Sequence, residues 1–304
     1  MSAPLQYLFD AISLGSLYAL GALGIALIFG VMRLVNFAHG DVITFSVFVL
    51  VAPTTEAVAP LLVGAWSTIP LVLAVLSSGA LLAVVSELLV FRHLRHATPA
   101  ATMVTSFALG VVIQNSLLVL HSSRPKAVNL WPEMTQPFEL FGARIPALQL
   151  LTVAITMLLL LSLAWALKRT RVGLDMRAAA EDFNMARGLG VRANRVILIA
   201  FAMSGALAAL IGLLMVNQTG LIDIRMGAPI MLVAFVATVI GGLGSLLGAV
   251  LGGLLIGVVS TLLQASLPLD ARPFRDAFVY LAVIALLVGR PNGLFVTGST
   301  RQRI

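Results

Sequence analysis

The longest stretch without a charged side chain, residues 226–269, restricts what this chain can fold into. Its 44 residues would form a helix of roughly 66 Å, about twice the thickness of a bilayer's hydrocarbon core. The stretch must therefore contain two membrane passes or a broken pair of helices. Other charge-free runs cover 11–32, 57–86, 97–120, 145–167 and 196–222, with shorter ones at 42–55 and 277–289.

The composition of the chain agrees with this pattern. Hydrophobic residues make up 60% of it and charged residues only 10%, whereas soluble proteins carry about 25% charged residues. Outer-membrane barrels are excluded as well, because their strands alternate between apolar and polar residues. The sequence predicts an all-α, polytopic helical membrane protein with about eight transmembrane segments, including broken or re-entrant helices. It excludes a globular enzyme and a nucleic-acid-binding protein.

The basic residues predict the orientation of the chain. Alternate loops hold 13 and 6 of the 19 Lys and Arg residues, and the richer set is expected in the cytoplasm. This places the N-terminus outside and the C-terminus inside, unless the short run 42–55 is re-entrant, which would move the N-terminus inside. The large loop 121–146 is then external and the charged loop 168–195 cytoplasmic. Neither is large enough to fold alone, so residues 1–304 are expected to form a single membrane domain.

Two interruptions of the helical pattern are candidates for a transport pathway. Paired helix breaks expose backbone N–H and C=O groups that can bind a solute. Asp41 is expected to cap the following helix and Gly40 to permit a turn, and Ser245 is a second candidate cap. An ordinary interhelical turn remains an alternative for each break. The pathway candidates are Asn36, His39, Gly40 and Asp41 at the first break, and Gly241, Gly242, Gly244 and Ser245 at the second.

The remaining polar residues suggest no catalytic or metal centre. Polar side chains within apolar runs are expected to face the bundle interior, and Glu87 and His121, near helix ends, are expected to be solvated. His39 has no other His or Cys near it in sequence, and the chain has no cysteine, so no metal site is expected. The polar residues within the runs are Gln114, Asn115, Asn217, Gln218 and Gln264.

The spacing of apolar residues in the loop 168–195 predicts a short amphipathic helix. Met176, Ala179, Ala180, Phe183 and Ala186 share one face, and Gly188 and Gly190 end the helix. This face is mostly alanine, which makes a weak lipid anchor, so we expect the helix to dock onto a partner protein. The residues expected at this contact are Ala179, Ala180, Glu181, Asp182, Phe183, Ala186 and Gly190.

Four ordered stretches give the chain a resemblance to a known family. Residues 15–30 with Asn36-Phe-Ala-His-Gly-Asp41, the loop 177–191, the stretch 241–249, and the ending 275–295 resemble permease subunits of branched-chain amino acid ABC importers. The chain is most similar to the H-type member of their H/M permease pair. Asp41 departs from the pattern, in which Glu is more frequent, but it keeps the charge. Permeases of urea importers share most of these motifs, so the substrate stays open between a branched-chain amino acid, urea or another small solute.

The resemblance implies a division of labour between subunits. It implies a multi-pass protein of the bacterial inner membrane that forms a pathway with a second permease, identical or homologous. A periplasmic binding protein would deliver the solute, and two cytoplasmic ATPase subunits would use ATP and Mg²⁺. No cofactor is expected on this chain itself, because neither of its two lysines lies in a P-loop motif.

Two other classes of function fit the sequence less well. A stand-alone secondary transporter or channel would need titratable residues inside the long runs, and these have none. An intramembrane enzyme would need a His base beside one of the candidate nucleophiles Ser16, Ser204 or Ser245, and no His lies within a mid-membrane run.

Overall fold

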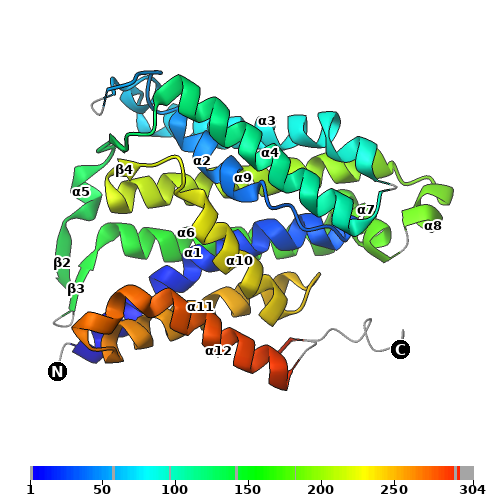
Figure 1. Cartoon of the computed structure of the whole chain (residues 1–304). Helices are drawn as coiled ribbons and strands as arrows, with labels where there is room; N and C mark the ends of the chain where they lie inside the picture. Colours follow the sequence, from blue (N-terminus) through cyan, green and yellow to red (C-terminus); the bar gives the residue numbers. More distant parts are fainter. Residues whose placement is uncertain are drawn as a thin grey trace. The chain divides into compact units, whose positions relative to one another are not determined.

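The computed structural model describes residues 3–56, 59–95, 97–140, 143–181, 183–290 and 293–294. These residues are predominantly helical, as predicted (Figure 1). The α-helices are α1 (Ala3–Met32), α2 (His39–Phe48), α3 (Thr68–Leu89), α4 (Pro99–His121), α5 (Pro132–Thr135), α6 (Ala147–Arg169), α7 (Arg171–Glu181), α8 (Phe183–Gly188), α9 (Ala193–Thr219), α10 (Gly227–Gly241), α11 (Leu246–Ser266) and α12 (Arg275–Gly289). Shorter elements are the 3-10 helices η1 (Val63–Ala65), η2 (Phe91–Leu94) and η3 (Leu269–Phe274) and the strands β1 (Lys126–Ala127), β2 (Pro137–Leu140), β3 (Ala143–Pro146) and β4 (Leu221–Ile222).

Six of the described helices are long and apolar enough to cross a membrane, namely α1, α3, α4, α6, α9 and α11. The shorter α2, α10 and α12 have 10, 15 and 15 residues. At about 1.5 Å per residue, α2 reaches only half-way across a hydrocarbon core of about 30 Å. The run 42–55 is therefore not a complete transmembrane helix, and the count of about eight segments stays a prediction.

The chain divides into two compact units, and neither is a continuous stretch of sequence. The first contains Met1–Ala26, Pro132–Leu160 and Leu232–Ile304, and the second contains Leu27–Trp131 and Leu161–Met231. The boundaries fall inside α1, α6 and α10, so each of these helices belongs to both units.

The first unit is built on close approaches between helix backbones. A Cβ atom on Gly253 would collide with the backbone of Ala19, and one on Gly257 with that of Gly15, so α11 packs directly on α1. Gly252 meets α10 at Ala237 in the same way. In a lipid environment such small-residue contacts stabilise a bundle, because apolar side chains gain little by leaving lipid. These glycines of α11 therefore serve packing within the chain.

The second unit is centred on α9, which packs along α3. A Cβ atom on Gly79 would lie 2.6 Å from the carbonyl oxygen of Gly205, so the two helices touch through their backbones. The short α2 packs against α3, α4 and α9, and its Ile43 carbonyl lies 2.8 Å from the Cβ position of Gly212. Buried apolar side chains at the end of α2, such as Val47 and Phe48, join a core shared with α3, α4 and α9. The second unit thus holds the first helix break inside a helical cluster.

Candidate functional site

The first helix break is fixed by a local hydrogen bond and by contacts with α4. α1 ends at Met32, residues 33–38 are not helical, and α2 begins at His39. The side-chain oxygen of the buried Asn36 accepts from the Ala38 N–H at 3.1 Å. The Phe37 N–H donates to the Ser106 hydroxyl of α4 at 3.2 Å. The ring of Phe37 also stacks on Phe107, with centroids 4.3 Å apart. The break is therefore a defined structure.

The start of α2 packs against α9 and the start of α10. His39 is 2% exposed, and its Nδ1 lies 3.3 Å from the Ser204 hydroxyl. A Cβ atom on Gly40 would lie 2.9 Å from the Gly227 carbonyl oxygen. Thr44 donates its hydroxyl proton to the Gly40 carbonyl at 3.2 Å and accepts the Gly227 N–H at 3.1 Å. Glycine at position 40 thus permits a close helix contact, and the prediction that it forms a turn was wrong.

The pair of His39 and Ser204 bears on the possibility of an intramembrane enzyme. The sequence had offered no base for Ser204, yet the fold places His39 beside it. Both side chains are buried, however, and His39 Nε2 has no hydrogen-bond partner among the described residues. In a serine triad a third group bonded to the other ring nitrogen orients the histidine. The pair therefore resembles a polar contact within the bundle.

Asp41 is a half-buried carboxylate in the first turn of α2, and it faces Gly110 near the middle of α4. The prediction that it caps α2 was wrong, because the N-cap residue is Ala38 and Asp41 lies within the first helical turn. That position still favours a negative charge, owing to the helix dipole. Asp41 forms no ion pair with any described residue. A Cβ atom on Gly110 would clash with Asp41 Oδ2, so the missing side chain of Gly110 makes room for the carboxylate. Sequence reasoning missed Gly110, whose only signal was a glycine in the middle of a transmembrane run.

The second break, between α10 and α11, is a tight turn in which most backbone N–H and C=O groups already form hydrogen bonds within the chain. Gly242 and Gly244 have φ angles of 99° and 90°, the left-handed region that glycine favours. The hydroxyl of Ser245 accepts the Gly248 N–H at 3.1 Å, which confirms the predicted cap. The Ile240 carbonyl accepts the Leu294 N–H at 2.7 Å, and Gly241 packs on Gly248. The first break therefore offers the stronger candidate for contact with a solute.

The other polar residues divide differently from the prediction. Asn217 is buried as expected, whereas Asn115, Gln218 and Gln264 are exposed on this chain and Gln114 is half-buried. Glu87 and His121 were expected to be solvated, which was wrong: they are 0% and 4% exposed. The ring of His121 packs on Phe48, 4.7 Å away, while Glu87 forms an ion pair with Arg95. The partner of His121 is remote in sequence, and the partner of Glu87 lies beyond the end of α3. No pattern of neighbouring residues could therefore predict the burial of either side chain.

The loop 168–195 forms two short helices, α7 and α8. Met176, Ala179 and Ala186 are buried within the chain itself, so this part of the predicted apolar face is not available to a partner. Leu174 and Leu189 are 59% and 80% exposed instead. Asp182 and the side chains of Ala180, Glu181 and Phe183 lie outside the described residues.

The end of α8 has the predicted glycine stop. Gly188 is its last residue, and Gly190 has a φ angle of 90°. The Gly190 N–H donates to the Arg187 carbonyl and the Val191 N–H to the Ala186 carbonyl. This pair of bonds is a Schellman motif, so the loop passes from α8 to α9 through a defined turn.

Comparison with known proteins gives a consistent result over almost the whole chain. The profile of the family described as branched-chain amino acid transport system / permease component matches residues 7–287. The high-affinity branched-chain amino acid transport system permease protein LivH of Salmonella typhimurium is 30% identical over 300 residues, covering 95% of this chain and 94% of the relative. BraD of Pseudomonas aeruginosa, of the same description, is 29% identical over 302 residues, covering 95% of each. The autoinducer 2 import system permease protein LsrC of Yersinia pseudotuberculosis is 36% identical over 137 residues, covering 43% of this chain and 39% of the relative. No solved structure matches.

Proposed function

Because the chain belongs to the branched-chain amino acid transport permease family, we propose that it forms, with a second permease, the pathway of an importer for branched-chain or related small amino acids. The chain is a multi-pass protein of the inner membrane and a permease subunit of an ABC importer. The observation that carries the proposal is the match to amino-acid permeases over 95% of the chain. A permease for urea or another small solute is the alternative.

The partners follow from what the chain lacks and from what its relatives do. Its sequence contains no P-loop, so energy from ATP and Mg²⁺ must come from other subunits. We propose two cytoplasmic ATPase subunits, a homologous or identical second permease, and a periplasmic solute-binding protein. The chain binds no cofactor of its own in this scheme.

The pathway would run beside the first helix break, where Asp41 faces the solute. An ionisable side chain within a transmembrane region is expensive unless it pairs with an opposite charge or lines a polar pathway. Asp41 forms no ion pair with any described residue and is only half-buried. An amino acid carries an α-ammonium group that this carboxylate can bind, whereas neutral urea does not. Asn36, His39 and Gly40 would hold Asp41 in place.

The loop 168–195 would couple the permease to an ATPase subunit. The basic residues of this loop, including Arg187 beside Leu189, favour an acidic rim on the partner. The exposed Leu174 and Leu189 supply apolar surface for a groove. The residues proposed for this coupling are Ala179, Ala180, Glu181, Asp182, Phe183, Ala186 and Gly190. Ala179 and Ala186 would hold the segment against its own bundle, and Gly190 would end α8.

Affinity purification of the tagged chain from its native membrane tests this function. We expect a second permease and ATPase subunits to copurify, and the complex in liposomes to import an amino acid only with ATP and its binding protein. Asp41→Asn should lower amino-acid uptake strongly while leaving the ATPase subunits bound. Saturable uptake by the purified chain alone would overturn the proposal. Uptake of urea instead of an amino acid would correct the substrate.

A further inference from the structure

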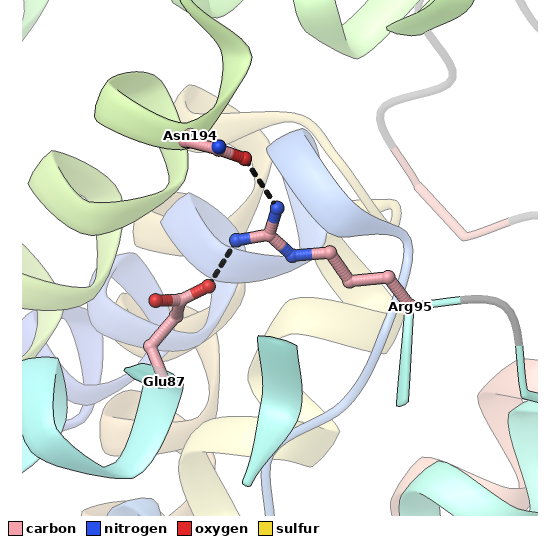
Figure 2. A network of polar contacts seen from close by, with 3 residues as sticks. All are labelled: Glu87, Arg95 and Asn194. Carbon is pink, nitrogen blue, oxygen red and sulfur yellow. Dashed lines mark hydrogen bonds and ion pairs between the residues drawn. The ribbon is translucent and has the colours of Figure 1, made fainter. Parts of the chain in front are cut away.

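A buried ion pair joins the end of α3 to the loop before α4. Glu87, in the last turns of α3, is 0% exposed. Its Oε1 accepts a hydrogen bond from Arg95 Nη2, which is also an ion pair. The other terminal nitrogen, Nη1, donates to Asn194 Oδ1 at 2.6 Å. Figure 2 shows the guanidinium between the two side chains. One arginine thus connects α3, the loop before α4 and the second residue of α9.

Energetics suggest that the pair serves to hold geometry. A buried carboxylate is very costly without an opposite charge, and removing one partner of such a pair is strongly destabilising. Apolar side chains of similar volume would often be equally stable, however. Glu87 Oε2 and Arg95 Nε have no hydrogen-bond partner among the described residues, so this network is not optimised for stability. What it adds is a fixed position for Arg95, and therefore for the group that Arg95 holds on α9.

That group lies directly after the loop 168–195. The Schellman motif at Gly190 fixes the exit from α8, and Arg192 precedes the first residue of α9. Asn194 follows Gly190 by only four residues, so the short segment between them leaves little room for independent movement. A displacement of α8 must therefore move the start of α9, where the Asn194 side chain is bonded to Arg95.

The other end of the connection is the helical cluster around the first break. α3 and α9 touch through the backbones of Gly79 and Gly205, and close-packed backbones do not deform gradually. Further along α9, Ser204 contacts His39 and Gly212 packs on α2. If α3 and the start of α9 move together, α2 and its Asp41 must move with them.

We propose that Arg95 is a positioning residue that joins the start of α9 to the end of α3, so that movement of the loop 168–195 displaces both helices as one body. This inference rests on the proposed coupling of that loop to an ATPase. It names the link inside the permease through which the coupling acts. Asn194 is the point at which the link can be cut while the Glu87–Arg95 ion pair stays intact.

The test compares three variants of the complete importer in liposomes with its binding protein, measuring solute uptake and ATP hydrolysis together. In Asn194→Ala, we expect normal assembly and an ATP cost per imported solute raised by about three- to tenfold, in the range of measured coupling changes. Asn194→Asp keeps an acceptor for Arg95 and should restore the wild-type ratio. Gln218→Ala removes an exposed amide at the opposite end of the same helix and should have no effect.

An unchanged ratio in Asn194→Ala, or equal losses in the Ala and Asp variants, would overturn the proposal. If Asn194→Ala did not assemble, the double variant Glu87→Leu with Arg95→Met decides, because it removes the link without leaving an unpaired charge. Wild-type coupling in an assembled double variant would overturn the proposal, and so would failure of this variant to assemble. If the wild-type complex shows no ATP-driven uptake, the proposed function itself fails.

Discussion

Replacing Gly110 by alanine should impair transport without unfolding the protein. The new Cβ atom would lie too close to Asp41 Oδ2, and because ordinary contact begins only at 3.4 Å, the carboxylate must move by about 1 Å. The end of a side chain can do this cheaply, and alanine gains about 0.5–1 kcal/mol over glycine inside a helix. Stability should therefore change little. If Asp41 loses a charge-assisted bond to an ammonium, worth about 1.5 kcal/mol, uptake falls roughly tenfold.

The matched control is Gly79→Ala, the same change on a helix of the same unit. Its Cβ atom would lie 2.6 Å from the Gly205 carbonyl oxygen and 2.7 Å from Ala209 Cβ, which belong to a packed helix that cannot move aside. Overpacking of this kind costs about 1–3 kcal/mol. Thermal unfolding in detergent and amino-acid uptake in liposomes separate the two effects. Wild-type uptake by Gly110→Ala would refute the importance of the position of Asp41, and an unshifted melting temperature of Gly79→Ala would refute the packing argument.

Three further changes test other parts of the structure. The chain lacks cysteine, so single cysteines at Ala127 and Leu189 should react with impermeant reagents from opposite sides of the membrane; labelling from one side would refute the predicted topology. Lys126→Met removes bonds from the ammonium to the Thr54 and Glu56 carbonyls and should lower stability by about 1–3 kcal/mol in thermal unfolding, which a conservative Lys126→Arg should partly restore. Ser245→Ala should cost about 1 kcal/mol through the lost helix cap, while Ser245→Asp retains it; equal melting temperatures would argue against the cap.

Local signals in the sequence predicted the parts of the structure that depend on neighbours along the chain. The turn at Gly242 and Gly244, the cap at Ser245 and the stop at Gly190 each need only a few adjacent residues. The long charge-free runs predicted the six long apolar helices for the same reason. These features follow from backbone geometry and hydropathy, which a single segment contains in full.

Which face of each helix is buried could not be predicted, for a physical reason. In a membrane the exposed face is as apolar as the buried one, so hydrophobic periodicity does not mark the interior. The burial of Glu87 depends on Arg95 and the loop that follows α3, and the space for Asp41 depends on a glycine 69 residues away. Met176 and Ala179 of α7 were wrongly assigned to a partner, because their contacts come from the rest of the chain.

Two carboxylates of the second unit, Glu87 and Asp41, show how the fold distinguishes structure from transport. Glu87 is fully buried and bonded to Arg95, whereas Asp41 is half-buried without an ion pair among the described residues. A charge needed only for structure would be compensated as Glu87 is, since an unpaired charge lowers stability. Asp41 avoids part of that cost through the dipole at the start of α2 and keeps its charge available. Glu87→Gln should therefore lower the melting temperature, because it leaves Arg95 without its counter-charge. Asp41→Asn should keep the melting temperature and lose uptake. A lower melting temperature in Asp41→Asn, together with lost uptake but unchanged stability in Glu87→Gln, would refute these assignments of the two carboxylates.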